Sequence, residues 1–217
     1  MHASALRRIL ILVALLGASA PALAHPHVWI TAKAEIVYGP DGKLTGVRHA
    51  WTFDPAYSAF SVQGLDKNND GKLTPDELQD LAKVNAESLA EFDFFTVLKA
   101  NGTKQAFGAA RDYGMTFENE QITLHFELPL KAPPQSAKTL SLEVYDPSYF
   151  VAFELAETEE PVRLTGAPTG CAVTLTKPKP VEASRQQQLS EAFFQALTSG
   201  SSAYGAGFAS RAIVACP

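Results

Sequence analysis

The sequence predicts an α+β protein that is mainly antiparallel β, with a helix-loop-helix inserted near its start and one helix near its C-terminus. Most of the second half consists of short segments in which apolar and polar residues alternate, separated by turn residues. These segments follow one another in runs and do not alternate with helices, which favours antiparallel sheets over a doubly wound α/β fold. Residues 75–92 instead carry apolar side chains at spacings typical of an amphipathic helix.

The first 24 residues have the pattern of a secretory signal peptide. Arg7 and Arg8 are followed by an apolar run at residues 9–16 and by the small residues of a cleavage site at 22–24. The apolar run is about half as long as a bilayer-spanning helix must be. We therefore expect residues 25–217 to form one periplasmic domain that does not span a membrane.

Net charge and cysteine content indicate which kinds of partner and which cellular compartment to expect. The signal segment holds two of the 18 basic residues and none of the 23 acidic ones, so the mature chain has a formal net charge of −7. This acidity argues against nucleic acid and anionic membranes as partners and mildly favours cations. The even cysteine pair, Cys171 and Cys216, predicts one disulfide in an oxidising compartment. Two free thiols are the weaker alternative.

The alternating segments give the order of the strands. Residues 28–37 and 44–53 flank turn residues at 39–43 and predict a hairpin. Asp54 and Pro55 have the pattern of an N-cap and a first helical position, and they open a short helix to residue 65. Further strands are expected within residues 94–107, 115–130, 138–146, 149–156, 162–166, 171–177 and 211–216. A proline-rich linker at 177–184 precedes an amphipathic helix at 184–198.

Residues 66–77, DKNNDGKLTPDE, match an EF-hand calcium loop position by position. Ca²⁺ takes roughly six to eight oxygen ligands, and a loop of about twelve residues supplies them from alternate positions. The ligands in order are Asp66, Asn68, Asp70, the backbone carbonyl of Lys72, Thr74 through a water, and the bidentate Glu77. Gly71 stands at position six, where the chain must turn sharply. Thr74 and Glu77 also have the pattern of a capping box that opens the next helix.

The flanking helices make residues 54–92 an EF-hand-like helical insertion. The alternative is a solvated turn rich in Asp and Asn between two helices. A single loop is expected to bind weakly, with a Kd of about 10⁻⁴ to 10⁻³ M. Such affinity suits a structural role outside the cytoplasm better than a sensor.

The histidines at the expected mature N-terminus form a second candidate metal site. After cleavage, His25 carries both a free α-amine and an imidazole, and His27 adds a third nitrogen. These ligands favour nickel, cobalt, zinc or copper over calcium. A polar chain end without a ligand role is the alternative. His49 and His125 lie on predicted strands and are expected to be half-buried strand residues.

The sequence offers little support for catalysis. It contains no nucleophile elbow, no glycine-rich phosphate loop and no HExxH motif. The aromatic cluster at residues 145–153 is typical of a core. We therefore expect that the protein is not an enzyme.

Several motifs in a fixed order resemble a bacterial family of unknown function, the domain of unknown function numbered one thousand and seven. They are HPHVWI at 25–30, WTFDPAYS at 51–58, DKNNDGKLTPDEL at 66–78, LEVYDPSYFVAF at 142–153, and the late cysteine pair. The resemblance implies a periplasmic component of an uncharacterised ABC-type transport system. It also implies an inner-membrane metal permease as partner, and it favours a transition-metal role for His25 and His27. The runs of strands do not fit the two α/β lobes of an ordinary solute receptor.

The sequence thus predicts a periplasmic metal-binding accessory protein of a nickel-, cobalt- or zinc-type transport system, with calcium bound structurally in one loop. One alternative is the solute-binding component of an ABC-type transporter, with the aromatic cluster as its pocket. A deep apolar pocket lined by Tyr145, Tyr149 and Phe150 would favour it. The other alternative is a calcium-stabilised structural adaptor.

Overall fold

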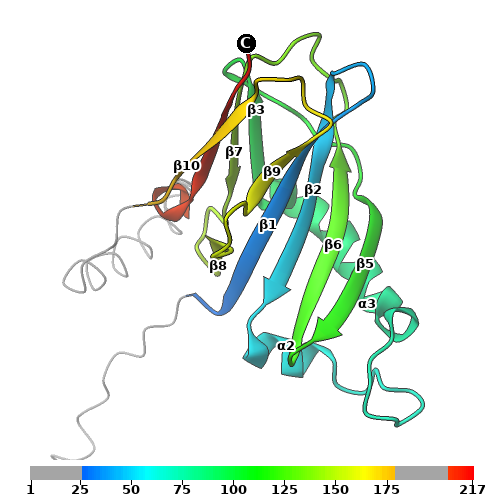
Figure 1. Ribbon diagram of the computed structural model, residues 1–217. Helices are drawn as coiled ribbons and strands as arrows, with labels where there is room; N and C mark the ends of the chain where they lie inside the picture. Colours follow the sequence, from blue (N-terminus) through cyan, green and yellow to red (C-terminus); the bar gives the residue numbers. More distant parts are fainter. Residues whose placement is uncertain (1–25, 179–204) are drawn as a thin grey trace, which may run out of the picture.

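The computed structural model describes residues 26–178 and 205–217 (Figure 1). The predicted signal peptide, His25 and the predicted helix at 184–198 lie outside the described residues. Within these residues the chain is mostly β-sheet with few helices, which fits the predicted α+β class.

The described strands form two sheets. The larger has the order β5-β6-β2-β1-β8, with β9 also paired to β1, and the smaller has the order β10-β11-β7-β3-β4. The strands of the larger sheet are β1 (Val28–Tyr38), β2 (Leu44–Phe53), β5 (Arg111–Glu118), β6 (Gln121–Pro129), β8 (Val151–Leu155) and β9 (Val162–Thr165). Those of the smaller are β3 (Thr96–Ala100), β4 (Thr103–Lys104), β7 (Thr139–Val144), β10 (Ala172–Thr176) and β11 (Arg211–Ala215).

The pairing is mainly antiparallel, as predicted, and the exceptions lie along one edge of β1. Strands β8 and β9 both run parallel to β1, the first opposite Val28 to Ala32 and the second opposite Ala34 to Val37. Residues 156–161 loop out between them, so the edge is interrupted opposite Lys33. The predicted β1–β2 hairpin is confirmed, with eight residue pairs in one register from Ile30 to Val37 and a register shift before Tyr38.

Two helices and a short 3₁₀ segment lie between β2 and β3. Helix α2 (Pro55–Ser61) begins at the predicted cap, where Asp54 accepts a hydrogen bond from the Tyr57 amide. Helix α3 (Pro75–Ser88) packs its buried face, with Leu78 and Ala82, into the core and lies against β5. It is followed by η1 (Leu89–Phe95), and η2 (Gly205–Phe208) precedes β11.

Both helices end earlier than the sequence predicted. Helix α2 ends at Ser61 and not at residue 65, because the chain turns at residues 62–64 and Gly64 takes a left-handed conformation at φ 76°. Helix α3 ends at Ser88 and not at residue 92, because the chain continues from Leu89 as the 3₁₀ segment η1.

Two buried clusters fill the interior. The first lies where α3 covers the larger sheet and includes Ile30, Trp51, Leu78, Leu124 and Phe153. The second lies where the two sheets face each other and includes Ile36, Val47, Leu98, Leu142 and Val214. Apolar burial of roughly 1.5–3 kcal/mol per large side chain makes these clusters the main source of stability.

The predicted disulfide is confirmed. Cys171 and Cys216 are bonded and lie 45 residues apart in the sequence, so β10 and the C-terminal strand β11 are tied together at one end. In the part of the chain that the structure describes, no helix has both the length and the apolar content needed to cross a bilayer.

Candidate metal sites and two clefts

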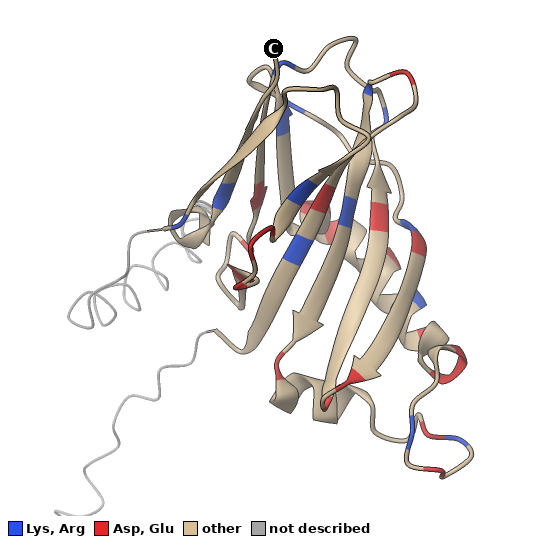
Figure 2. Cartoon of the chain, in the orientation of Figure 1, with Lys and Arg blue, Asp and Glu red and all other residues tan. Residues whose placement is uncertain are grey.

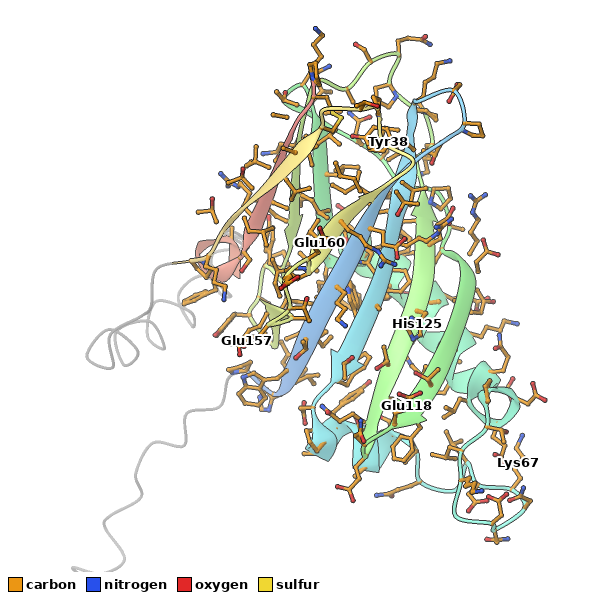
Figure 3. The ribbon with its side chains drawn as sticks, viewed as in Figure 1. Tyr38, Lys67, Glu118, His125, Glu157 and Glu160 are labelled. Atoms are coloured by element: carbon orange, nitrogen blue, oxygen red, sulfur yellow. A yellow bond between two sulfur atoms is a disulfide. The ribbon has the colours of Figure 1, made fainter. Side chains whose placement is uncertain are left out.

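The loop at residues 66–77 turns where the calcium motif requires it. Gly71 lies at φ 78°, the left-handed conformation expected at position six, and Asn69 lies at φ 57°. Leu73 packs against the first core cluster, as the apolar residue of such a loop should. Figure 3 shows Lys67 of this loop at one end of the molecule and Tyr38 towards the other.

Glu77 connects this loop to helix α3. The Thr74 side chain accepts a hydrogen bond from the Glu77 amide, and Glu77 accepts one from the Thr74 amide at 3.0 Å, so the predicted capping box is confirmed. The other Glu77 oxygen accepts from the Lys67 amide at 3.0 Å. Hydrogen bonds from Thr74 and Lys67 lower the pKa of Glu77, so this carboxylate stays charged over a wider pH range.

The other loop carboxylates also accept backbone hydrogen bonds. Asp66 accepts from the Gly71 amide at 2.9 Å and from the Asp70 amide at 3.2 Å, and Asp70 accepts from the Lys72 amide at 2.8 Å. These bonds hold the side chains on the inner side of the turn.

The donor set of the loop fits a hard cation, because it offers carboxylate, amide and hydroxyl oxygens and no nitrogen or sulfur ligand. Over residues 26–178 and 205–217, however, no three His, Cys, Asp or Glu side chains converge closely enough to form a metal cluster. The entering helix also differs from an EF-hand. It ends at Ser61 and is separated from Asp66 by a turn, so only α3 runs directly on from the loop.

The structure places the histidines apart. The His27 amide donates to the Phe150 carbonyl at 2.9 Å, and the two rings lie 4.7 Å apart between centroids. His49 and His125 are on neighbouring strands, but His49 is paired with Phe126 and His125 with Ala50, which puts them on opposite faces of the sheet. Neither therefore completes a site with the other.

His49 is a buried structural residue. It is 3% exposed, which corrects the expectation of a half-buried position. Thr96 donates its hydroxyl hydrogen to the Phe94 carbonyl at 2.7 Å, so it accepts from His49 Nε2 at 3.2 Å. His49 Nδ1 then accepts from the Trp51 indole at 3.2 Å.

This network accounts for both nitrogens of a neutral imidazole. Burial lowers the pKa of His49 to about 3, so the ring stays uncharged at neutral pH. The sequence did contain a signal for this burial. His49 lies an even number of residues from Val47, Trp51 and Phe53, which are buried, so its side chain is on the same face of β2.

The outer face of the larger sheet carries a row of alternating charges across five strands (Figure 2). Cross-strand register aligns Arg111 on β5, Glu127 on β6, Arg48 on β2, Glu35 on β1 and Arg163 on β9. Glu127 accepts from Arg48 Nε at 2.7 Å and from Arg111 Nε at 3.1 Å. Glu35 accepts from Arg163 Nε at 2.9 Å. Neighbouring positions thus hold opposite charges, which stabilises a sheet.

The two carboxylates of this row remain ionised. Burial acts to raise the pKa of Glu127, but hydrogen bonds and charge from Arg111 and Arg48 outweigh it, and the net shift is downward. The pKa of Glu35 is lowered in the same way against the same opposing effect of burial, chiefly by Arg163 and Thr165.

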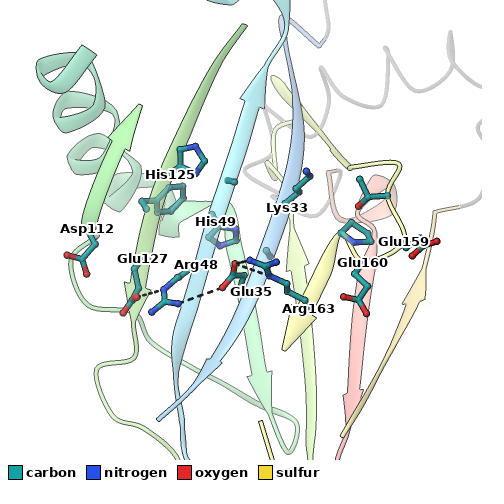
Figure 4. Close-up of a pocket in the computed structure, with 15 residues that line it drawn as sticks. Lys33, Glu35, Arg48, His49, Asp112, His125, Glu127, Glu159, Glu160 and Arg163 are labelled. Atoms are coloured by element: carbon teal, nitrogen blue, oxygen red, sulfur yellow. Dashed lines mark hydrogen bonds and ion pairs between the residues drawn. The ribbon is translucent and has the colours of Figure 1, made fainter. Parts of the chain in front are cut away.

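A polar cleft of about 910 Å³ lies over this row (Figure 4). Lys33 and His125 lie on its floor, and Glu159 and Glu160 stand on the loop between β8 and β9. The charged row forms much of the lining, and its side chains already neutralise one another. Cross-strand ion pairing therefore accounts for the charged side chains on this face.

An apolar cleft of about 960 Å³ opens between the larger sheet and the segment after α3. Tyr145 and Phe150 line it, whereas Tyr149 does not appear among its lining residues. Tyr149 instead stacks on Phe208 of η2, with ring centroids 4.4 Å apart. Two of the three expected aromatic residues therefore line an apolar pocket, and the third packs elsewhere.

Comparison with known proteins assigns the family but no activity. The chain is 26% identical over 195 residues to an uncharacterised protein of Haemophilus influenzae, and the match covers 89% of this chain and 92% of that protein. The family model DUF1007, described as a protein of unknown function, matches residues 10–216. Because this match covers nearly the whole chain, the protein belongs to the DUF1007 family of unknown function.

Proposed function

We propose that this protein is a periplasmic accessory protein of a transport system, and that one calcium ion in the loop at residues 66–77 stabilises it. The observation that carries the calcium proposal is the position of Glu77. Its carboxylate reaches the loop start through the Lys67 amide, while its backbone belongs to the first turn of α3. An ion between Asp66 and Glu77 would join the two ends of the loop and hold α3 against it.

The role of the ion in this proposal is structural. Leu73 anchors the loop on the first core cluster, and Leu78 of α3 belongs to that same cluster. Neutralising three carboxylates within one loop would offset their mutual repulsion and fix both anchors. A lone exposed loop fits weak binding, with a Kd of about 10⁻⁴ to 10⁻³ M, in a compartment where calcium is plentiful.

Calcium titration by calorimetry on the mature protein tests this proposal. One site is expected, and Glu77→Gln should weaken binding by at least about tenfold because it removes the bidentate carboxylate. Asp76→Asn is the matched control, since it removes one negative charge at a loop position that supplies no ligand. Equal weakening by both variants, or no heat of binding to the unaltered protein, would contradict the proposal.

The transition-metal part of the function is a proposal about the mature N-terminus. His25 and His27 would present nickel, cobalt, zinc or copper to an inner-membrane metal permease. The chemistry of amine and imidazole ligands supports it. The hydrogen bond from the His27 amide to Phe150 also supports it, because it fixes this histidine beside β8.

Metal titration of protein whose N-terminus has been verified by mass spectrometry tests this part. Replacing His25 and His27 by alanine should abolish tight binding of each metal, whereas His125→Ala should leave it unchanged. Binding that survives the double replacement would assign the metal to another site, and the histidine proposal would then be withdrawn.

Binding of an organic solute is a second candidate function, and the apolar cleft favours it. Its volume of about 960 Å³ lies in the usual range of ligand pockets, roughly 300–1,000 Å³. Its lining is mostly apolar and aromatic, with a few polar groups, as in other small-molecule sites.

A further inference from the structure

The apolar cleft has a deep floor made by the inner face of the larger sheet. Ile30, Trp51, Phe53 and Leu124 line it and are 1–6% exposed. They come from β1, β2 and β6, so the floor rests on the most extensively paired strands of the sheet. A floor of this kind is rigid and is fixed before any ligand arrives, which lowers the entropic cost of binding.

The walls of the cleft present aromatic rings to solvent. Phe92 is 54% exposed and Phe150 is 46% exposed, on two separate segments of the lining. Phe92 stacks on Phe95 with centroids 5.2 Å apart, and Phe95 also lines the cleft. Aromatic side chains gathered around a concave apolar surface are typical of a binding site.

The wall segment is also strained. Asp93, Phe94 and Phe95 follow one another at φ 50°, 54° and 48°, a conformation that costs energy for residues other than glycine. Because of this turn, the chain reverses directly from α3 into β3 while Phe92 and Phe95 stay at the cleft. Strain retained at such a place is typical of a functional site.

The rim of the cleft is electrostatically negative. Asp93 is paired with Lys104 at 3.1 Å, but Glu91 has no ion pair within the described residues. Asp146 also lines the cleft, but it is buried and accepts hydrogen bonds from Ser148 and from the Val151 amide. Helix α3 also ends here, with Asn85 and Leu89 in the lining, and a helix C-terminus adds partial negative charge.

From these observations we propose that the cleft binds an amphipathic small molecule, with an apolar ring-sized body against Trp51 and Phe53 and an uncharged or cationic end at the rim. The proposal rests on the solute-binding candidate function and adds the class of ligand. It excludes carboxylates, sulfonates and phosphates, because the negative rim would repel them and no unpaired cation lines the cleft in the described residues.

Two fluorescent probes with the same ring body test the charge preference. N-phenyl-1-naphthylamine is uncharged, and 1-anilinonaphthalene-8-sulfonate carries one negative charge on the same framework. We expect the mature protein to bind the uncharged probe with enhanced, blue-shifted emission. Its affinity should be at least about tenfold higher than that of the anion, which corresponds to about 1.4 kcal/mol.

A pair of tryptophan variants, one at the start of η1 and one on α3, tests the location. Leu89→Trp places a large ring in the cleft and should reduce binding of the uncharged probe by at least about tenfold, since it fills part of the volume. Val84→Trp is the matched control, because Val84 lies five residues earlier on α3, is 60% exposed and is outside the cleft. Thermal unfolding of both variants verifies that each is folded.

The possible results distinguish a wrong ligand class from a failure of solute binding itself. Stronger binding of the anionic probe, with Leu89→Trp still blocking it, would overturn the ligand class and leave solute binding standing. Binding of neither probe, or equal binding by Leu89→Trp and Val84→Trp, would overturn both.

Discussion

The loop at residues 66–77 and the pair of sheets are stabilised in different ways. In the loop, the carboxylates of Asp66, Asp70 and Glu77 accept hydrogen bonds from backbone amides at most ten residues away. In the sheets the partners are remote, since Arg48 and Glu127 are 79 residues apart and His49 and Thr96 are 47 apart. The loop is thus a local unit, whereas the sheets depend on the whole chain.

Breaking the disulfide tests the long-range side of this comparison and should have the largest effect. Replacing Cys171 and Cys216 by serine frees a closed loop of 45 residues. The chain-entropy estimate for a loop of this length is about 4 kcal/mol of unfolding free energy. Urea denaturation measures it, and a loss below about 1 kcal/mol would show that β11 is held by its strand pairs alone.

As the pH falls, the His49 network in the core should lose stability at a higher pH than the carboxylate ion pairs do. The pKa of His49 is lowered to about 3 in the folded state, so below its ordinary value of 6.5 the unfolded chain takes up a proton that the folded chain does not. Stability is therefore complete above pH 6.5 and falls as the pH drops towards 3. Between pH 7 and 5 this loss is about 2 kcal/mol.

Two matched histidine variants test whether His49 causes this loss of stability. In His49→Gln most of the decrease between pH 7 and 5 should disappear from denaturation curves measured at each pH. Burial lowers the pKa of His125 as well, but its ring is exposed on the outer face, so His125→Gln should keep most of the decrease. An unchanged pH dependence in His49→Gln would contradict the assignment.

Removing one charge from the outer row should have a smaller effect. Glu127→Gln leaves Arg48 and Arg111 without their shared carboxylate and should lower the unfolding free energy by about 1–2 kcal/mol. The half-exposed arginines limit the effect, because water screens them. Glu160→Gln, in the same cleft, should change stability by less than about 0.5 kcal/mol. Equal losses of unfolding free energy in the two variants would show that the row of charges does not stabilise the sheet.

What the sequence predicted well is what depends on neighbouring residues. The structure has three features of this kind, each determined by residues that are close in the sequence. They are the β1–β2 hairpin, the Asp54 cap and the Thr74–Glu77 capping box. Strands β8 and β9 were predicted within residues 149–156 and 162–166, but their parallel pairing with β1 was not, because it joins residues more than 100 positions apart.

The same reason explains what was missed in the candidate sites. The aromatic cluster at residues 145–153 was interpreted as core, and Phe153 is indeed buried there. Tyr145 and Phe150 line a cleft instead, together with Asp93 and Phe95 of the strained turn, which no local sequence pattern predicts. The loop motif at residues 66–77 could be recognised because its residues lie close together in the sequence, whereas the cleft is assembled from separate elements.

Thermal unfolding of the mature protein in 10 mM calcium, compared with the same protein in chelator, tests the central claim most directly. With a Kd of about 10⁻⁴ to 10⁻³ M, the ion should add about 1.4–2.7 kcal/mol of stability. This corresponds to a rise in Tm of roughly 3–10 °C for a chain of this size. The rise should vanish in Glu77→Gln and persist in Asp76→Asn. A Tm that does not respond to calcium, or that responds equally in Glu77→Gln, would contradict the account.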